Sequence, residues 1–285
     1  MDTRLLNPRR VAVLLAATFA ALAIASYVVL YYTKSPVDAL LVVLGFSLAL
    51  VDTSVGMGFG TIGTPVLLIS GFSSKNVVPA ILLAQLLSAG VGSFVHHRYK
   101  NIDLLNFKGK NSKMAISLVG FGVVGAVIGV LLAIRLPSTY VNLYIGTLVV
   151  AIGLLILARP KLVFSWARLF GLSIISGFNK ALGGSGYGTV ATTGLLASGH
   201  GIRDSVGVTV FSVAIINMVG FGLYLLTNSI SDYVIIAGLG IGAVIGSQIG
   251  PRITTRLGSG GGKRLIAATA ILLGVLTVAT TLIRA

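Results

Sequence analysis

The chain has 285 residues, of which 55% are hydrophobic and only 9% are charged, and its mean hydropathy is +1.01. Soluble domains carry about 25% charged residues, so this composition predicts an all-α polytopic membrane protein. Gly reaches 37 residues without a G-X-Y period and Pro only 7, which excludes a collagen-like chain. Cys is absent, which excludes disulfides, thiol catalysis and thiolate metal sites.

The first apolar run, residues 11–32, follows Arg4, Arg9 and Arg10 and is long enough to span a bilayer. It exceeds the usual apolar region of a signal peptide, so we expect a retained transmembrane helix. Six later runs also have the length of full spans, which brings the predicted number of transmembrane helices to seven. They cover residues 77–97, 114–134, 139–158, 205–227, 232–250 and 264–283.

Two further apolar stretches, residues 37–71 and 167–199, are interrupted by glycine clusters. A run of 11 to 17 residues covers only roughly 16–25 Å as a helix, which is short of a bilayer. Each stretch is therefore predicted to form a re-entrant hairpin of two half-helices. The half-helices are expected at residues 37–53, 61–71, 167–181 and 188–199.

The two broken stretches are related in sequence. A shift of 128 places residues 56–61 on residues 184–189, and a shift of 117 places residues 125–129 on residues 242–246. A hairpin plus three spans gives an odd number of crossings, so the two copies are predicted to form an inverted repeat. The expected organisation is one integral membrane domain with an N-terminal helix (residues 1–34), repeat 1 (residues 35–160) and repeat 2 (residues 161–285).

The formal charge of +15 comes from short basic clusters between apolar runs, a pattern that indicates topology before nucleic-acid binding. With the N-terminus in the cytoplasm and the C-terminus outside, 16 of the 21 basic residues fall on the inner side. Only Lys34, Lys75, Arg135 and Arg284 fall outside. We therefore expect a multi-pass protein of the cell membrane with this orientation and no nucleic-acid partner.

Non-helical backbone at membrane depth is tolerated only inside protein or beside a water-filled cavity, so the paired glycine breaks point to a transport site. Half-helices that begin near Thr61 and Thr189 would direct free N–H groups at the midplane, where an anion could bind. The glycines expected to let the backbone approach a ligand are Gly58, Gly60, Gly186 and Gly188. Close helix packing is the alternative role, and it fits Gly120, Gly125, Gly129 and Gly242 better.

Asp52 and Lys180 occupy equivalent positions at the two breaks, where an ionisable residue at the bilayer centre costs about 2.5–3.5 kcal/mol. They could form an ion pair that fixes the register of the hairpins. Alternatively, Lys180 is the counter-charge of an anionic substrate and Asp52 a proton or cation site. In a third interpretation, one of them reaches the interface by snorkelling.

Further polar residues could complete a binding pocket, because hydroxyls and amides donate to an oxyanion without adding charge. These candidates are Thr64, Gln85, Asn179, Ser185, Thr192 and Asn217. Each could instead bond to its own helix or tie two helices together. The segment 96–99, His-His-Arg-Tyr, is interpreted as an interfacial anchor, and no metal site or cofactor is expected.

Two segments resemble the sulfite exporter TauE/SafE family of membrane permeases: residues 58–71 with the following 96–103, and residues 176–199. The similarity extends from about residue 37 to the end of the chain. It implies secondary transport of a sulfur-containing or carboxylated anion, such as sulfite, sulfoacetate or another organosulfonate. Thr193 departs from the family pattern, in which proline is usual at that position.

The sequence therefore predicts a transporter that binds a small anion near the midplane and alternates access, with export as the expected direction. A passive anion channel, or a transporter that couples cations or protons through Asp52, are the alternatives. An enzyme is not expected, because the chain lacks Glu and Cys and shows no catalytic constellation. The bilayer and a small anion are the expected partners, proton coupling is conceivable, and the oligomeric state is undefined.

Overall fold

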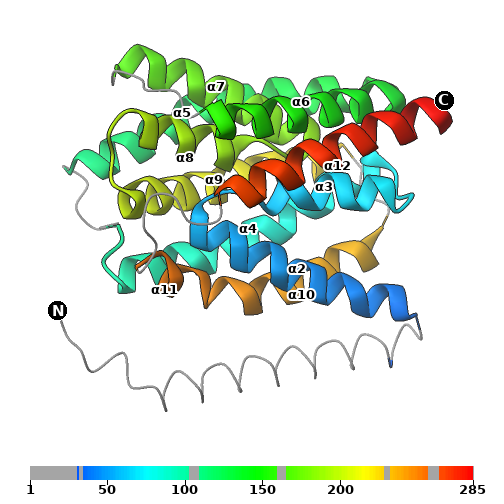
Figure 1. The fold of residues 1–285 in the computed structure, drawn as a ribbon, viewed down its shortest axis with the longest axis horizontal. Coiled ribbons are helices and arrows are strands. Elements are labelled where there is room, and N and C mark those ends of the chain that lie inside the picture. Colours follow the sequence, from blue (N-terminus) through cyan, green and yellow to red (C-terminus); the bar gives the residue numbers. More distant parts are fainter. Residues whose placement is uncertain are drawn as a thin grey trace.

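The computed structural model describes residues 31, 35–102, 109–158, 165–227, 232–255 and 263–284. Within these ranges all regular secondary structure is α-helical, and the helices lie side by side in one bundle (Figure 1). The prediction of an all-helical protein is confirmed. The helices are α2 (Pro36–Val55), α3 (Phe59–Ile69), α4 (Ser74–Arg98), α5 (Lys110–Ala133), α6 (Ser138–Ala158), α7 (Trp166–Gly183), α8 (Tyr187–Ala197), α9 (Ile202–Leu226), α10 (Tyr233–Ser247), α11 (Gly250–Thr254) and α12 (Lys263–Arg284).

Seven helical segments in the described ranges are long and apolar enough to cross a membrane. Six correspond to predicted spans, and the seventh is Asp38–Val55 in α2, whereas the predicted span 11–32 lies outside the described residues. Helix α2 has 20 residues and extends about 30 Å, so it is longer than the half-helix expected at 37–53. The re-entrant course of the broken stretches stays a prediction.

The two copies of the repeat agree in their helix boundaries. A shift of 128 residues carries both ends of α3 onto those of α8, and both ends of α4 onto those of α9. In both copies a helix of 11 residues follows the glycine break and a helix of 25 residues follows the next turn. The proposed boundaries at residues 34 and 160 stay a prediction, because they lie outside the described ranges.

The repeats exchange packing partners through glycine contacts. Helix α5 packs on α7 of the other repeat, and α10 packs on α2. A Cβ atom on Gly125 would fall 2.0 Å from the Ile174 carbonyl oxygen, and one on Gly242 would fall 1.9 Å from that of Val42. Gly129 makes a similar approach to α7, so close packing is confirmed for these three glycines. It is wrong for Gly120, which has no heavy atom within 4 Å of its Cβ position.

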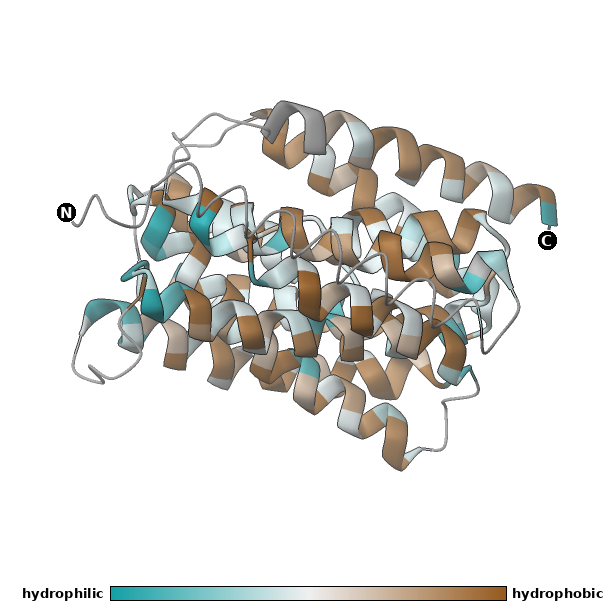
Figure 2. Cartoon of the chain, turned by 90° about the horizontal axis from the view of Figure 1, so that it is seen from below, coloured by the Kyte–Doolittle hydropathy of each residue, from teal (hydrophilic) through white to brown (hydrophobic). Residues whose placement is uncertain are grey.

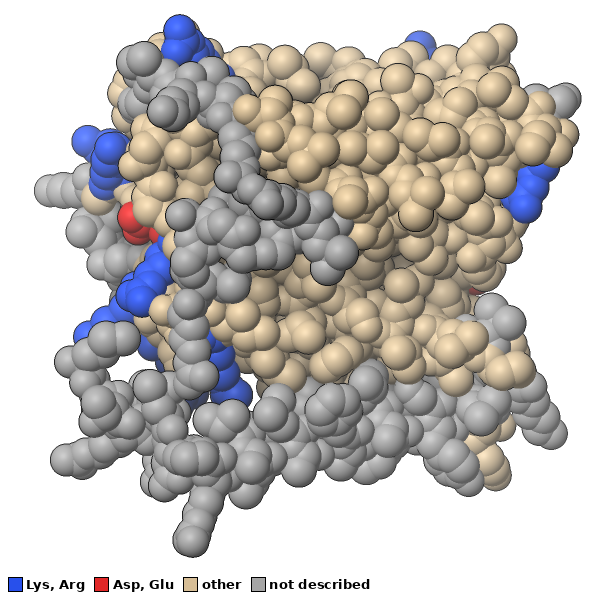
Figure 3. All heavy atoms as spheres, in the orientation of Figure 1, with Lys and Arg blue, Asp and Glu red and all other residues tan. Residues whose placement is uncertain are grey.

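Charge is distributed unevenly between the two ends of the bundle. Hydrophobic residues follow the helices between ends that carry the hydrophilic ones (Figure 2), and most of the visible Lys and Arg side chains gather at one end (Figure 3). We call this the basic end; its described basic residues are Arg98, Lys100, Lys110, Lys113, Arg168, Arg203 and Arg252. The opposite end carries Lys75, Arg135 and Arg284.

Candidate functional site

Each broken stretch turns at two glycines in the left-handed region. Helix α2 ends at Gly56 with φ 76°, and helix α7 ends at Gly184 with φ 67°. The following short helices start after Gly58 with φ 129° and Gly186 with φ 95°. Residues with a Cβ atom rarely adopt these φ angles. Glycine at all four positions therefore lets the chain leave one helix and begin the next within three residues.

Gly60 and Gly188 also make a close backbone contact between the repeats. A Cβ atom on Gly60 would lie 1.9 Å from the Gly184 carbonyl oxygen, and one on Gly188 would lie 2.6 Å from that of Gly56. Each short helix therefore begins against the broken end of the other repeat. These two glycines let the backbones of the repeats touch, and their expected role beside a ligand stays a prediction.

Hydroxyl groups join the two repeats where the short helices begin. The Thr61 and Thr189 Oγ1 atoms, which are equivalent by the 128-residue shift, lie 3.0 Å apart. The Thr192 hydroxyl donates to the Gly56 carbonyl oxygen at 2.9 Å. Its equivalent, Thr64 Oγ1, is buried and has no hydrogen-bond partner among the described residues.

The Asp52 carboxylate caps the N-terminus of α3. Its Oδ1 accepts a hydrogen bond from the Phe59 backbone N–H at 3.2 Å, and its Oδ2 accepts one from Gln85 Nε2 at 2.7 Å. The side chain is 2% exposed. A carboxylate at a helix N-terminus is stabilised by the helix dipole and the free N–H groups, so this chain already places an anion at one of its two short helices.

Lys180, the equivalent of Asp52, forms no hydrogen bond with the described residues of the short helix that follows it. Its Nζ donates to the Gly184 carbonyl oxygen at 2.7 Å, and the side chain is 2% exposed. The ammonium group therefore does not reach the interface by snorkelling. No ion pair joins Lys180 to Asp52 within the described ranges, so the structure does not contain the ion pair that was one of the three interpretations.

A small central cavity brings most of the predicted site together. It offers about 10 Å³ to the centre of a water-sized sphere, which is the room of one water molecule. Its lining residues are Asp52, Gly58, Gly60, Thr61, Gln85, Lys180, Gly186, Tyr187, Gly188 and Thr189. All of these except Tyr187 were candidates from the sequence. Tyr187 could have been found as the equivalent of Phe59, directly before Gly188.

Five candidates lie outside the lining of this cavity. Asn179 accepts a hydrogen bond from the Tyr144 hydroxyl of α6, and Thr192 contacts Gly56 as described. The others are buried without a hydrogen-bond partner in the described part of the chain: Thr64 Oγ1, Ser185 Oγ, and both side-chain polar atoms of Asn217. Buried polar groups normally find partners, so these are unusual positions near the breaks.

His96 is a buried structural residue, and its interpretation as an interfacial anchor is wrong. Its Nε2 lies 2.9 Å from the Thr53 carbonyl oxygen, and its Nδ1 lies 3.0 Å from Asn101 Nδ2. A carbonyl only accepts and an amide nitrogen only donates, so a neutral ring protonated at Nε2 satisfies both contacts. The equivalent residue of repeat 2, Tyr224, donates to the Ala181 carbonyl oxygen at 3.0 Å. No metal-binding cluster occurs among the described residues.

Comparisons with known proteins agree with this architecture. Residues 41–277 match the family described as Sulfite exporter TauE/SafE. The chain is similar to the "Probable membrane transporter protein YtnM" of Bacillus subtilis (strain 168), with 26% identity over 193 residues that cover 62% of each chain. It is also similar to the "Probable membrane transporter protein ORF9" of Sinorhizobium sp, with 25% identity over 246 residues, 83% of this chain and 90% of that protein. No solved structure matches the chain.

Proposed function

Because this chain belongs to the Sulfite exporter TauE/SafE family of membrane transporters, we propose that it is a secondary transporter of a small sulfur-containing or organic anion. Sulfite, sulfoacetate and other organosulfonates are the candidate substrates. The proposal places the anion at the midplane, between the N-termini of α3 and α8. Alternating access would follow from movement of the inverted repeats.

The difference between the two short-helix N-termini carries this proposal. At α3 the Asp52 carboxylate accepts from the Phe59 N–H and occupies the terminus. At α8 the equivalent residue is Lys180, and no described residue hydrogen-bonds to the N–H groups of Gly188 and Thr189. An oxyanion at α8 would repeat the geometry of the carboxylate at α3, with a cation nearby in place of a second carboxylate.

Lys180 can move away from the Gly184 carbonyl oxygen without leaving that oxygen lacking a hydrogen-bond donor. In repeat 1 the Gly56 carbonyl oxygen accepts from Thr192, whereas in repeat 2 the Gly184 carbonyl oxygen accepts from Lys180. Thr64, the equivalent of Thr192, lies beside Gly184, and its Oγ1 has no hydrogen-bond partner among the described residues. A Cβ atom added to Gly184 would lie 2.9 Å from this Oγ1. When Lys180 turns to the anion, Thr64 can donate to the Gly184 carbonyl oxygen in its place.

Charge balance connects anion binding to Asp52. With Asp52 ionised and Lys180 protonated the cavity is formally neutral, so a univalent anion would leave an uncompensated buried charge. A proton on Asp52 restores neutrality, and this supports Asp52 as the coupling residue. An anion that moves with one proton follows the proton gradient, whereas an anion alone is driven outward by an inside-negative potential.

The cavity size bears on the alternatives. An oxyanion of four or more heavy atoms exceeds a cavity for one water, so binding requires the short helices to separate. The contact between Thr61 and Thr189 closes the same place. Both observations favour a transporter over a passive anion channel.

The proposal is tested in proteoliposomes by anion uptake together with charge movement during jumps of sulfite, sulfate, thiosulfate, sulfoacetate, taurine and a carboxylate, because a univalent anion that moves with one proton carries no net charge. We expect a saturable response to one anion, lost in Lys180→Met but retained in the exposed control Lys113→Met. An unchanged response in Lys180→Met would make Lys180 a structural residue. A response to none of the anions would contradict the proposal and would favour cation transport that depends on Asp52.

The orientation is proposed from the positive-inside rule, with the basic end in the cytoplasm. The absence of native Cys permits a direct test. Gly109→Cys, between α4 and α5 at the basic end, should resist a membrane-impermeant thiol reagent added outside cells. Asn228→Cys should react with it, and the reverse pattern would invert the orientation.

A further inference from the structure

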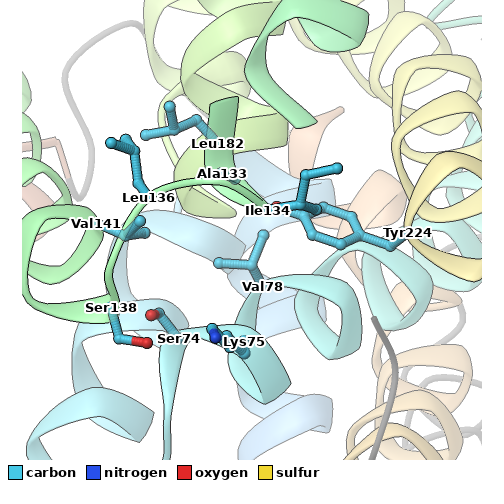
Figure 4. A pocket seen from close by; sticks show the side chains of 10 residues that line it. All are labelled: Ser74, Lys75, Val78, Ala133, Ile134, Leu136, Ser138, Val141, Leu182 and Tyr224. Carbon is cyan, nitrogen blue, oxygen red and sulfur yellow. The ribbon is translucent and has the colours of Figure 1, made fainter. Parts of the chain in front are cut away.

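A second, larger pocket opens at the end of the bundle opposite the basic end. Its volume is about 300 Å³, and we call it the vestibule. It is lined by Ser74, Lys75, Val78, Ala133, Ile134, Leu136, Ser138, Val141, Leu182 and Tyr224. Figure 4 shows Ser74, Lys75 and Ser138 together on one side, with Leu136, Val141 and Leu182 across the pocket from them. One side of the vestibule therefore carries a cation and two hydroxyls, and the other side is apolar.

The vestibule leads towards the central cavity. On α4, Val78 in its wall lies seven residues before Gln85 in the cavity lining, or about 10 Å along the helix axis. On α7, Leu182 lies two residues after Lys180. Val78 and Leu182 are each 2% exposed, so a thin layer of apolar side chains separates the two spaces.

Internal symmetry maps the vestibule onto the basic end. The shift of 128 carries Lys75 to Arg203 and Leu182 to Ser54. The shift of 117, which also superposes Arg135 on Arg252, carries the vestibule residues of the α5–α6 turn onto α11. The equivalent pairs are Ala133 with Gly250, Ile134 with Pro251, Leu136 with Ile253 and Ser138 with Thr255.

At the basic end these equivalent residues pack against one another. Arg203 Nη2 donates to the Thr255 carbonyl oxygen at 2.7 Å. The Thr254 hydroxyl donates to the Ser54 carbonyl oxygen at 2.8 Å. A Cβ atom on Gly250 would fall 2.0 Å from the Thr53 hydroxyl oxygen. Helix α11 thus closes over the end of α2, at the place where the turn after α5 stands back from α7.

The same closure cannot form with the same bonds at the vestibule. Pro137 replaces Thr254 and offers no hydroxyl, and Ala133 replaces Gly250 and adds a Cβ atom. The basic end is therefore closed by polar contacts, whereas the vestibule end would close by apolar contacts and a single bond from Lys75 to Ser138. This difference favours the arrangement seen in the structure, closed at the basic end and open at the other.

We propose that the vestibule is the access site through which a small anion reaches the central cavity, and that the α11 contacts at the basic end are its closed counterpart. The inference rests on the proposed transport function and extends it to a route. Lys75 attracts the anion at the mouth. In the opposite state Lys75 bonds to Ser138 as Arg203 bonds to Thr255, and the contacts of α11 with α2 and α9 open.

Thiol accessibility tests this inference in the Cys-free chain. Ala133→Cys probes the vestibule wall, Ser54→Cys probes the closed end, and Arg135→Cys is an exposed control. With an impermeant anionic thiol reagent on the matching side, Ala133→Cys should react about tenfold faster than Ser54→Cys. Thr254→Val, or Arg203→Gln as a second variant, weakens the closed end. Either should speed labelling of Ser54→Cys and slow that of Ala133→Cys by similar factors, because one equilibrium governs both.

The outcomes separate this inference from the proposed function. An unreactive Ala133→Cys, or faster labelling of Ser54→Cys without slower labelling of Ala133→Cys, would overturn the inference. Charge movement driven by sulfoacetate should fall at least about tenfold after complete labelling of Ala133→Cys. Undiminished charge movement would overturn the route and leave anion transport standing. If Ser54→Cys labels faster while Ala133→Cys labels more slowly, but the protein moves none of the tested anions, the access route is supported and the proposed anion substrate is contradicted.

Discussion

The two glycine breaks have nearly the same backbone and opposite charges. In repeat 1, Asp52 reaches forward to the N-terminus of the next helix; in repeat 2, Lys180 reaches to the C-terminal carbonyl of its own helix. Each follows the local dipole, because helix N-termini attract anions and C-termini attract cations. One short helix thus has a built-in anion and the other has none, and this difference is the basis of the proposed substrate site.

The largest expected effect tests the contact between the breaks. Gly60→Ala should lower the free energy of unfolding by about 3 kcal/mol, because its Cβ would collide with the Gly184 carbonyl oxygen. Gly188→Ala, with a longer approach to Gly56, should cost less. Gly90→Ala has open space around its Cβ position and serves as the control. Thermal unfolding in detergent would measure all three, and equal losses would contradict the crossed packing.

A second comparison uses the equivalent anchors on α4 and α9. Tyr224→Phe removes one hydrogen bond to the Ala181 carbonyl oxygen and should cost about 1 kcal/mol. His96→Phe removes contacts to both Thr53 and Asn101 and should cost about 2 kcal/mol. Thermal unfolding in detergent would measure the loss of stability in both variants. A smaller loss for His96→Phe would show that Asn101 finds another partner.

A smaller change is expected from Thr64→Val, which removes no hydrogen bond present in the structure. Its stability should be nearly unchanged, but the anion concentration for half-saturation should rise about fivefold, the equivalent of about 1 kcal/mol for one lost bond. Thr192→Val, which does lose a bond to Gly56, is the matched variant and should destabilise the protein instead. Unchanged half-saturation in Thr64→Val would contradict the exchange with Lys180.

Asp52→Asn should have only a small effect on stability. The Asn oxygen can still accept from the Phe59 N–H, and the Gln85 amide can rotate so that its unpartnered Oε1 accepts from the new NH₂ group. Wild-type transport should rise as the pH falls, since protonation of Asp52 neutralises the loaded site. Asp52→Asn should remove this pH dependence, measured as flux between pH 5 and 8. A persistent dependence would assign coupling elsewhere.

The repeat was readable from the sequence because glycine is strongly favoured where the backbone has a positive φ, as it has at Gly56, Gly58, Gly184 and Gly186. The shift of 128 predicted that Thr61 and Thr189, or Asp52 and Lys180, are equivalent, and nine of the cavity's ten lining residues were candidates. It did not predict that Gly60 faces Gly184, or that Asp52 takes the α3 terminus. Those facts depend on how the two repeats pack, which a pattern within one repeat does not contain.

Other differences have the same origin. Helix α2 continues to Val55 because packing on α10 and the cap at Gly56 stabilise its last turns, whereas the sequence suggested an earlier end. The sequence suggested that His96 is a surface residue, because it precedes Arg98 at the end of a span. In the structure its ring is buried and forms hydrogen bonds with the Thr53 carbonyl oxygen and the Asn101 side chain.

The contact between Thr61 and Thr189 joins two chemically identical groups. Either hydroxyl can be the donor, so reversing the bond needs only the rotation of two O–H groups and no displacement of a heavy atom. Whichever donates, the other keeps a proton that is free to point away from the pair. The hydrogen bond between the repeats therefore has no preferred donor of its own. Any preference for one direction of this bond must come from the unequal charges of Asp52 and Lys180 on either side.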